Sequence, residues 1–188
     1  MDRKDFFGES LKYGLCACGL MAFNPGNIFS SPDTTPGPED SKIQKDKEFI
    51  VNWLNDLFNT MDEVLDEKTR IKLMEGTGRG CFNRFQFKKD LAIKGKGDLD
   101  KLIEAYQENF ECWKEGEKVH IRYGATSKQC YCPVANGRPV KEHDLHCECT
   151  RMTHQSVFET ALGRPFKAEI AESLRRGGKT CHIIINLS

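Results

Sequence analysis

The sequence predicts an α+β domain in which N-terminal amphipathic helices pack on a C-terminal antiparallel sheet with an intervening helix. Between residues 46 and 113, apolar residues recur at three- and four-residue steps, the period of helices with one buried face. From residue 117 to 188 apolar residues often alternate with polar ones, which is the period of half-buried strands. Helices followed by strands are typical of a single α+β domain, here residues 46–188.

Length and charge narrow the classes of function. A chain of 188 residues can bury a substantial core. Its 28 basic and 28 acidic residues give a formal net charge of zero, so no overall field favours nucleic acid as a partner. No apolar run is long enough to span a membrane. The nine cysteines are odd in number, which favours free thiols, a metal site or a mixture over a disulfide-stapled miniprotein.

Residues 1–23 have two interpretations. Arg3–Phe7, followed by Leu11–Phe23, resembles a twin-arginine export signal with Lys4 in place of the second arginine, and Leu15–Cys18 loosely resembles a lipoprotein cleavage site. Polar residues interrupt the apolar stretch, and an amphipathic N-terminal helix explains the same pattern. The protein is therefore expected in the cytoplasm, or exported if the signal is functional.

Residues 24–45 are expected to be a linker because prolines and glycines occur there among Ser, Thr and Asp. The clearest helical pattern follows. Its apolar stripe is expected to lie in the core. The stripe consists of Phe49, Ile50, Trp53, Leu54, Leu57, Phe58, Met61, Val64 and Leu65.

Three further helices are predicted before the sheet. Asp66 is expected to cap the first, which would end in a turn at Gly76–Gly80. This glycine run lacks the preceding strand and the following Lys-Ser/Thr of a phosphate loop. A second helix begins near Phe82 and ends at residues 94–97, and Asp98 caps a third.

The remaining elements alternate with turns. Val119–Tyr123 is predicted as a strand, residues 124–127 as a turn and Lys128–Cys132 as the returning strand. A helix is expected from about Thr153 to a cap at Gly163. Residues 166–170 and 181–187 then form a C-terminal hairpin around Arg175–Gly178.

Two Cys-x-Cys pairs form the first candidate site. On a strand, Cys130 and Cys132 would present both thiols on one face, as would Cys147 and Cys149 if extended. A return of the chain between the pairs would bring four thiolates around a zinc ion, with His143 or His146 replacing one. The alternatives are that one cysteine of each pair is a small buried hydrophobic residue, or that a disulfide joins the pairs in an oxidising compartment.

The second pair is also a candidate nucleophile. Cys147 and Cys149 precede the helix predicted at Thr153, whose dipole favours a thiolate, and His146 would be the base. His154 and Arg151 lie nearby in sequence. The alternative is that the histidines are exposed loop residues.

The last candidates surround the C-terminal turn. Arg175 and Arg176 could bind a carboxylate or phosphate through their guanidinium groups, unless this is a solvated hairpin tip. Two cysteines complete this set. Cys81 follows glycines that allow close backbone approach. Cys181 shares the face of Ile183 and Ile185 on the last strand and is most simply a core residue, unless it lies close to the other thiols.

The C-terminal third resembles known proteins. His146–Thr150, Phe158-Glu159, Leu162–Pro165 and Glu172–Cys181 are similar to the end of 4-vinyl reductase-type ligand-binding domains and of aminothiazoline-carboxylate hydrolase-like bacterial proteins. Within this resemblance, the cysteine content is similar to that of an uncharacterised Cys-rich branch of bacterial proteins. The resemblance covers residues 117–188 and implies helices over an antiparallel sheet, with a pocket for a small, largely apolar molecule between them. Cys181 corresponds to the cysteine that opens the last strand of the family.

Three functions follow as expectations. The first is a domain that binds a small molecule or a metal, with zinc as the candidate cofactor. The second is a thiol-dependent hydrolase of a small cyclic substrate. The third is an exported structural protein with disulfides.

Overall fold

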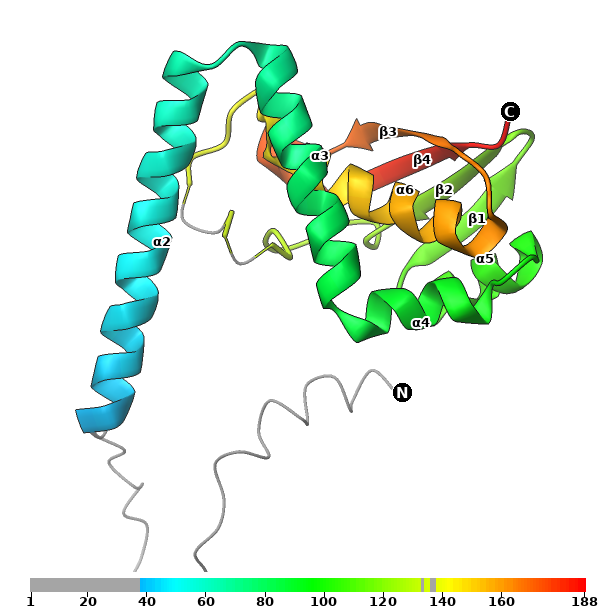
Figure 1. Cartoon of the computed structure of the whole chain (residues 1–188), viewed down its shortest axis with the longest axis horizontal. Coiled ribbons are helices and arrows are strands. Elements are labelled where there is room, and N and C mark those ends of the chain that lie inside the picture. The colour runs from blue at the N-terminus through cyan, green and yellow to red at the C-terminus, as the bar shows by residue number, and fades with distance from the viewer. Residues whose placement is uncertain (1–37, 133, 136–137) are drawn as a thin grey trace, which may run out of the picture. The chain divides into compact units, whose positions relative to one another are not determined.

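The computed structural model describes residues 38–132, 134–135 and 138–188 (Figure 1). The segment predicted as an export signal or N-terminal helix, residues 1–23, lies outside these residues, as does most of the predicted linker. The chain divides into two compact units, Met1–Lys47 and Glu48–Ser188. The second unit contains the whole sheet and all the candidate site residues.

The described elements confirm the predicted α+β class. The helices are α2 (Pro38–Val64), α3 (Glu67–Arg84), α4 (Gln86–Lys94), α5 (Leu99–Gln107) and α6 (Glu148–Leu162), with short 3₁₀ turns η2 (Leu145–Cys147) and η3 (Leu174–Arg176). The strands are β1 (Glu111–Glu115), β2 (Lys118–Arg122), β3 (Lys167–Glu172) and β4 (His182–Asn186).

The four strands form one antiparallel sheet in the order β1-β2-β4-β3. Ile121 of β2 lies opposite Ile183 of β4, and Ile183 lies opposite Ile170 of β3. The register follows the alternation of apolar residues, since a slip by one residue would turn these side chains away from the core. β3 and β4 form the predicted C-terminal hairpin.

Helix α6 packs between this sheet and the helices α3 and α4 (Figure 1). The core on its sheet side contains Leu102, Tyr106, Ile121 and Phe158, all fully buried. Helix α3 packs along α6, and α4 contacts its C-terminal half. The N-terminal end of α6 and the chain that leads into it therefore lie between α3 and the sheet.

Local signals for helix ends are confirmed. Asp66 accepts hydrogen bonds from the Thr69 backbone N–H and hydroxyl, and so caps α3. Asp98 accepts from the first two N–H groups of α5 that follow Leu99. Gly163 has the left-handed backbone, with φ of 68°, that ends α6.

The glycine run does not end a helix, contrary to the prediction. Gly76, Gly78 and Gly80 all lie inside α3. A Cβ atom at Gly78 would lie 2.4 Å from the Cys149 carbonyl oxygen and 2.8 Å from Met152 Cβ. The glycine lets α3 approach α6 closely, so its function is helix packing.

Two boundaries in the sheet-rich half were also predicted wrongly. Residues 128–132 form no strand, because both edges of β2 are already paired, with β1 and with β4. The hairpin partner of β2 is instead β1, part of which had been assigned to the helical half. Helix α6 begins at Glu148 rather than near Thr153.

Two predictions about α2 were wrong as well. The linker was expected to reach residue 45, but α2 begins at Pro38, a favoured first helical residue. The apolar stripe was expected to be buried, yet much of it is exposed, with Phe49 at 71% and Trp53 at 57%.

Candidate functional site

A small cavity collects most of the predicted site residues. Its volume is about 30 Å³. Four cysteines, Cys130, Cys132, Cys147 and Cys181, reach it from three separate parts of the chain. The other lining residues are Tyr123, Tyr131, His146, Thr150, Ile170, Glu172, Ser173 and Ile183.

Cys147 is buried at the start of α6. Its Sγ lies 2.9 Å from the Ser173 hydroxyl oxygen. Burial raises the pKa of Cys147 to about 12, and its neighbours Cys181, Asp144 and Cys130 raise it further, against the opposing hydrogen bond of Ser173. The predicted effect of the helix dipole does not prevail here, so Cys147 is a neutral thiol and a poor nucleophile at pH 7.

Cys149 lies in the first turn of α6, near Cys81 rather than in the lining of the cavity. Burial raises its pKa, and the nearby Cys81 and Cys132 add to this effect. Cys81 is on α3, and the ammonium group of Lys88 in α4 lies 2.7 Å from its sulfur. Cys149 and Cys81 do not line the cavity, so the structure separates the members of the second Cys-x-Cys pair.

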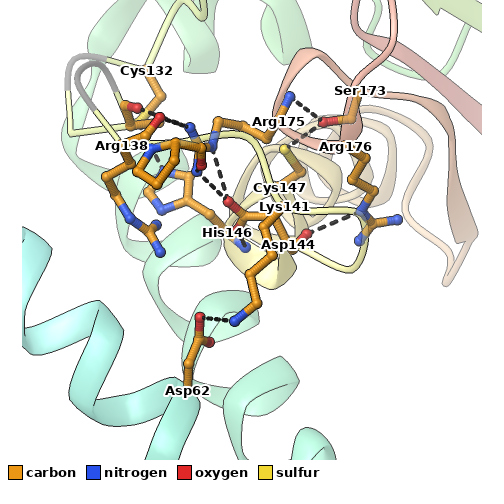
Figure 2. Close-up of polar contacts among 12 residues, drawn as sticks. Asp62, Cys132, Arg138, Lys141, Asp144, His146, Cys147, Ser173, Arg175 and Arg176 are labelled. Carbon is orange, nitrogen blue, oxygen red and sulfur yellow. Dashed lines mark hydrogen bonds and ion pairs between the residues drawn. The ribbon is translucent and has the colours of Figure 1, made fainter.

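Cys132 and His146 form a thiol–imidazole pair at the cavity. Cys132 Sγ lies 3.2 Å from His146 Nε2 (Figure 2). Burial lowers the pKa of His146 to about 4, although Asp144 opposes the shift, and burial raises the pKa of Cys132. The pair is therefore neutral at pH 7. His146 Nδ1 is buried and has no hydrogen-bond partner among the described residues.

Arg175 has a role that its sequence position did not indicate. It was expected to bind an anion, but it is only 4% exposed, and all five of its N–H groups are used within the chain (Figure 2). Its Nε and Nη2 donate to Asp144 Oδ2 at 2.9 and 2.6 Å. The other donors reach carbonyl oxygens of Ala135, Arg138 and Pro139.

The arginine therefore holds Ala135 and the segment from Arg138 to Asp144 against η3. Asp144 uses its other oxygen to accept from the His146 backbone N–H, at 2.8 Å, and so caps η2. Arg176 donates to the Asp144 carbonyl oxygen and to Glu148. Where this segment approaches α2, the Lys141 ammonium group pairs with the Asp62 carboxylate at 2.6 Å (Figure 2).

A buried hydrogen-bonded chain leads from the core to the cavity. His154 lies between two hydroxyls, with Nδ1 3.1 Å from Tyr106 and Nε2 2.8 Å from Tyr123. Burial lowers the pKa of His154 to about 3 and raises that of Tyr123 above its usual range. The neutral ring accepts the proton of fully buried Tyr106 and donates from Nε2, because the reverse would leave the Tyr106 proton without an acceptor. The Tyr123 proton is then available to the thiols of the cavity.

The thiols are close but not arranged as a finished metal centre. All seven cysteines of the described part of the chain are free thiols. Among residues 38–132, 134–135 and 138–188, no three His, Cys, Asp or Glu side chains are placed to hold a metal ion. His143, an expected alternative ligand, is exposed and does not line the cavity.

Sequence reasoning missed several cavity residues. Tyr123 was assigned only to the apolar face of a strand, and Ser173 and Glu172 only to a family pattern. Asp144 had no assigned role. The local signal for Asp144 was present, because an Asp two residues before a buried backbone N–H commonly caps a turn.

Comparison of the chain with protein-family models, curated proteins and solved structures gives no match. The resemblance of residues 117–188 to 4-vinyl reductase-type domains therefore stays a prediction. No helix within the described residues has the length and apolar character needed to cross a membrane.

Proposed function

We propose that the domain binds one thiophilic metal ion, with zinc as the candidate, in the cysteine-lined cavity. The convergence of four thiols on a space of about 30 Å³ carries the proposal. This volume corresponds to an ion or one to two waters, whereas sites for small organic ligands are about 300 Å³ or larger. Of the two ligand classes expected from the sequence, the metal is the better supported.

The ligand set would come from Cys130, Cys132, Cys181 and either Cys147 or His146. Cys147 would give up its contact with Ser173 on binding. The thiols would turn toward the ion, since they do not point at a common centre without it. Cys130 and Cys132 can do so because they lie outside regular secondary structure.

Binding would release protons. Burial raises the pKa of Cys132, Cys147 and Cys181, whereas a thiolate is the metal ligand. Metal affinity should therefore increase with pH. The Tyr123 hydroxyl would stabilise a bound thiolate by donating its proton, as outer-shell donors do in metal sites.

The test is titration of reduced, metal-free protein with Co²⁺, followed by the thiolate-to-cobalt absorption band. Cys130→Ser and Cys181→Ser should each weaken binding roughly 100-fold or more. Cys112→Ser is the matched control, since Cys112 is buried in β1 and does not line the cavity. An absent band, or equal affinity in all three variants, would contradict the proposal.

A thiol-dependent hydrolase is the second candidate, and the 3.2 Å contact between Cys132 and His146 favours it. The nucleophile would then be Cys132 rather than Cys147 or Cys149. Iodoacetamide labelling of the native protein with mass mapping tests this idea. Cys132 should label first, and His146→Gln should slow it; uniformly slow labelling of all cysteines argues against the enzyme.

A further inference from the structure

Residues 48–64 of α2, which belong to the second compact unit, carry apolar side chains on more of the helix circumference than the rest of that unit covers. Phe58 faces His146, with ring centroids 5.0 Å apart, and the Arg138 guanidinium lies over the Phe58 ring. Within the described residues, nothing covers the adjoining face. This exposed strip consists of Phe49, Ile50, Trp53, Leu57 and Val64, which are 71%, 55%, 57%, 38% and 68% exposed.

The exposed strip is large for a monomer. With an aromatic side chain presenting about 150–250 Å² and the others somewhat less, the exposed fractions amount to on the order of 600 Å². The largest apolar patch on a typical monomer is about 300–600 Å². Two such strips in contact would bury on the order of 1,200 Å², the lower limit for a specific interface.

The spacing of the strip is that of a helix pair. Ile50, Leu57 and Val64 lie seven residues apart, and Ile43 precedes Ile50 by the same step in α2. A seven-residue apolar repeat keeps one seam of a helix against a second helix. A matching repeat is available on a second copy of the same chain.

The charges of α2 select the direction of pairing. Residues 42–47 contain three lysines and one aspartate. Residues 56–63 contain no basic residue and three acidic ones, of which Asp62 is paired within the chain and Asp56 and Glu63 have exposed side chains. Antiparallel pairing places each basic end against the acidic end of the other copy, and parallel pairing places like charges together. A twofold axis near residues 53–54 would set Ile50 of one copy against Leu57 of the other. We infer that the protein forms a homodimer through antiparallel pairing of the exposed strip of α2.

The test is sedimentation velocity of the full chain over a range of concentrations. The wild type should approach twice its 21.4 kDa mass as concentration rises. Ile50→Glu with Leu57→Glu should raise the dissociation constant at least about 100-fold, since both charges would enter the seam. Asn52→Glu with Asn59→Glu is the matched control, because these exposed residues lie on the other side of α2 and should leave the dimer intact.

Direction is tested by charge exchange. Lys42→Glu should weaken the dimer, and adding Glu63→Lys should restore it. These two residues precede Ile43 and Val64 and therefore flank the same side of the seam, and they come together only in the antiparallel pair. A monomer at every concentration, or a dimer that Ile50→Glu with Leu57→Glu does not weaken, would overturn the inference. A lack of rescue by Glu63→Lys would overturn the antiparallel arrangement.

Discussion

Replacing Arg175 by Met tests whether the Arg175–Asp144 pair holds the loop that carries the candidate site. Methionine keeps part of the side-chain volume but removes all five N–H donors. The Asp144 carboxylate, on a residue only 3% exposed, then loses its cationic partner. Removing one partner of a buried ion pair typically costs about 3–5 kcal/mol.

Arg176→Met is the matched control on the adjacent residue. Arg176 is half-buried and donates to one carbonyl oxygen and one carboxylate, so its loss should cost about 1 kcal/mol. Urea unfolding at pH 7, followed by far-UV circular dichroism, gives the free energy of unfolding of each variant. Arg175→Met should be less stable than Arg176→Met by at least about 2 kcal/mol.

A second variant separates the unpaired charge from the lost hydrogen bonds. In the Arg175→Met background, Asp144→Asn removes the buried charge and should recover part of the lost stability. Equal stability of Arg175→Met and Arg176→Met, within experimental error, would refute the assignment of Arg175 as the clamp of this loop.

Three further outcomes follow from local geometry. Gly78→Ala should destabilise the protein by about 1–3 kcal/mol, because its Cβ would lie 2.4 Å from the Cys149 carbonyl oxygen, as unfolding in urea would show. Gly76→Ala, with no neighbour within 4 Å, should stabilise it by up to about 1 kcal/mol in the same assay. His154, with its pKa lowered to about 3, should stay neutral in NMR spectra at pH 5. Its contribution to stability should be complete at about pH 8 and fall by about 2 kcal/mol between about pH 8 and 5, because the unfolded chain binds the proton there and the folded chain does not. A His154→Gln variant should lose this pH dependence; retention of the full dependence would contradict the assignment.

Elements defined by local chemistry were predictable from the sequence. Asp66, Asp98 and Gly163 end their helices through groups within a few residues of themselves. The alternation of apolar residues that predicted the C-terminal hairpin also sets its register. A slip of one residue between the strands would turn their apolar side chains from the core to the other face of the sheet. Such signals require no knowledge of distant contacts.

The arrangement of the cysteines depends on contacts that the sequence does not display. A two-residue spacing places Cys147 and Cys149 on one face only in an extended chain, and the early start of α6 separates them. Arg175 is engaged by residues 31 to 40 positions earlier. The exposed half of α2 has the same periodicity as a buried helix, so periodicity alone cannot tell which element covers it.

The Arg175 clamp and the cavity should be energetically coupled if the proposed metal site exists. Asp144 joins both, since it accepts from Arg175 and caps the turn that presents His146 and Cys147. A metal that binds only the folded protein stabilises it by about 2.7 kcal/mol when its concentration is 100 times the dissociation constant.

Loss of the hydrogen bonds made by Arg175 should therefore lower both the metal affinity and the free energy of unfolding. Arg175→Met should reduce Co²⁺ affinity as well as stability, because the loop ligands would have to be ordered on binding. Gly78→Ala should reduce stability while leaving affinity unchanged, since Gly78 of α3 contacts Cys149 and Met152 of α6 and none of these residues lines the cavity. Equal loss of affinity in both variants would mean that binding depends only on global stability, and the clamp would then have no specific role in forming the site.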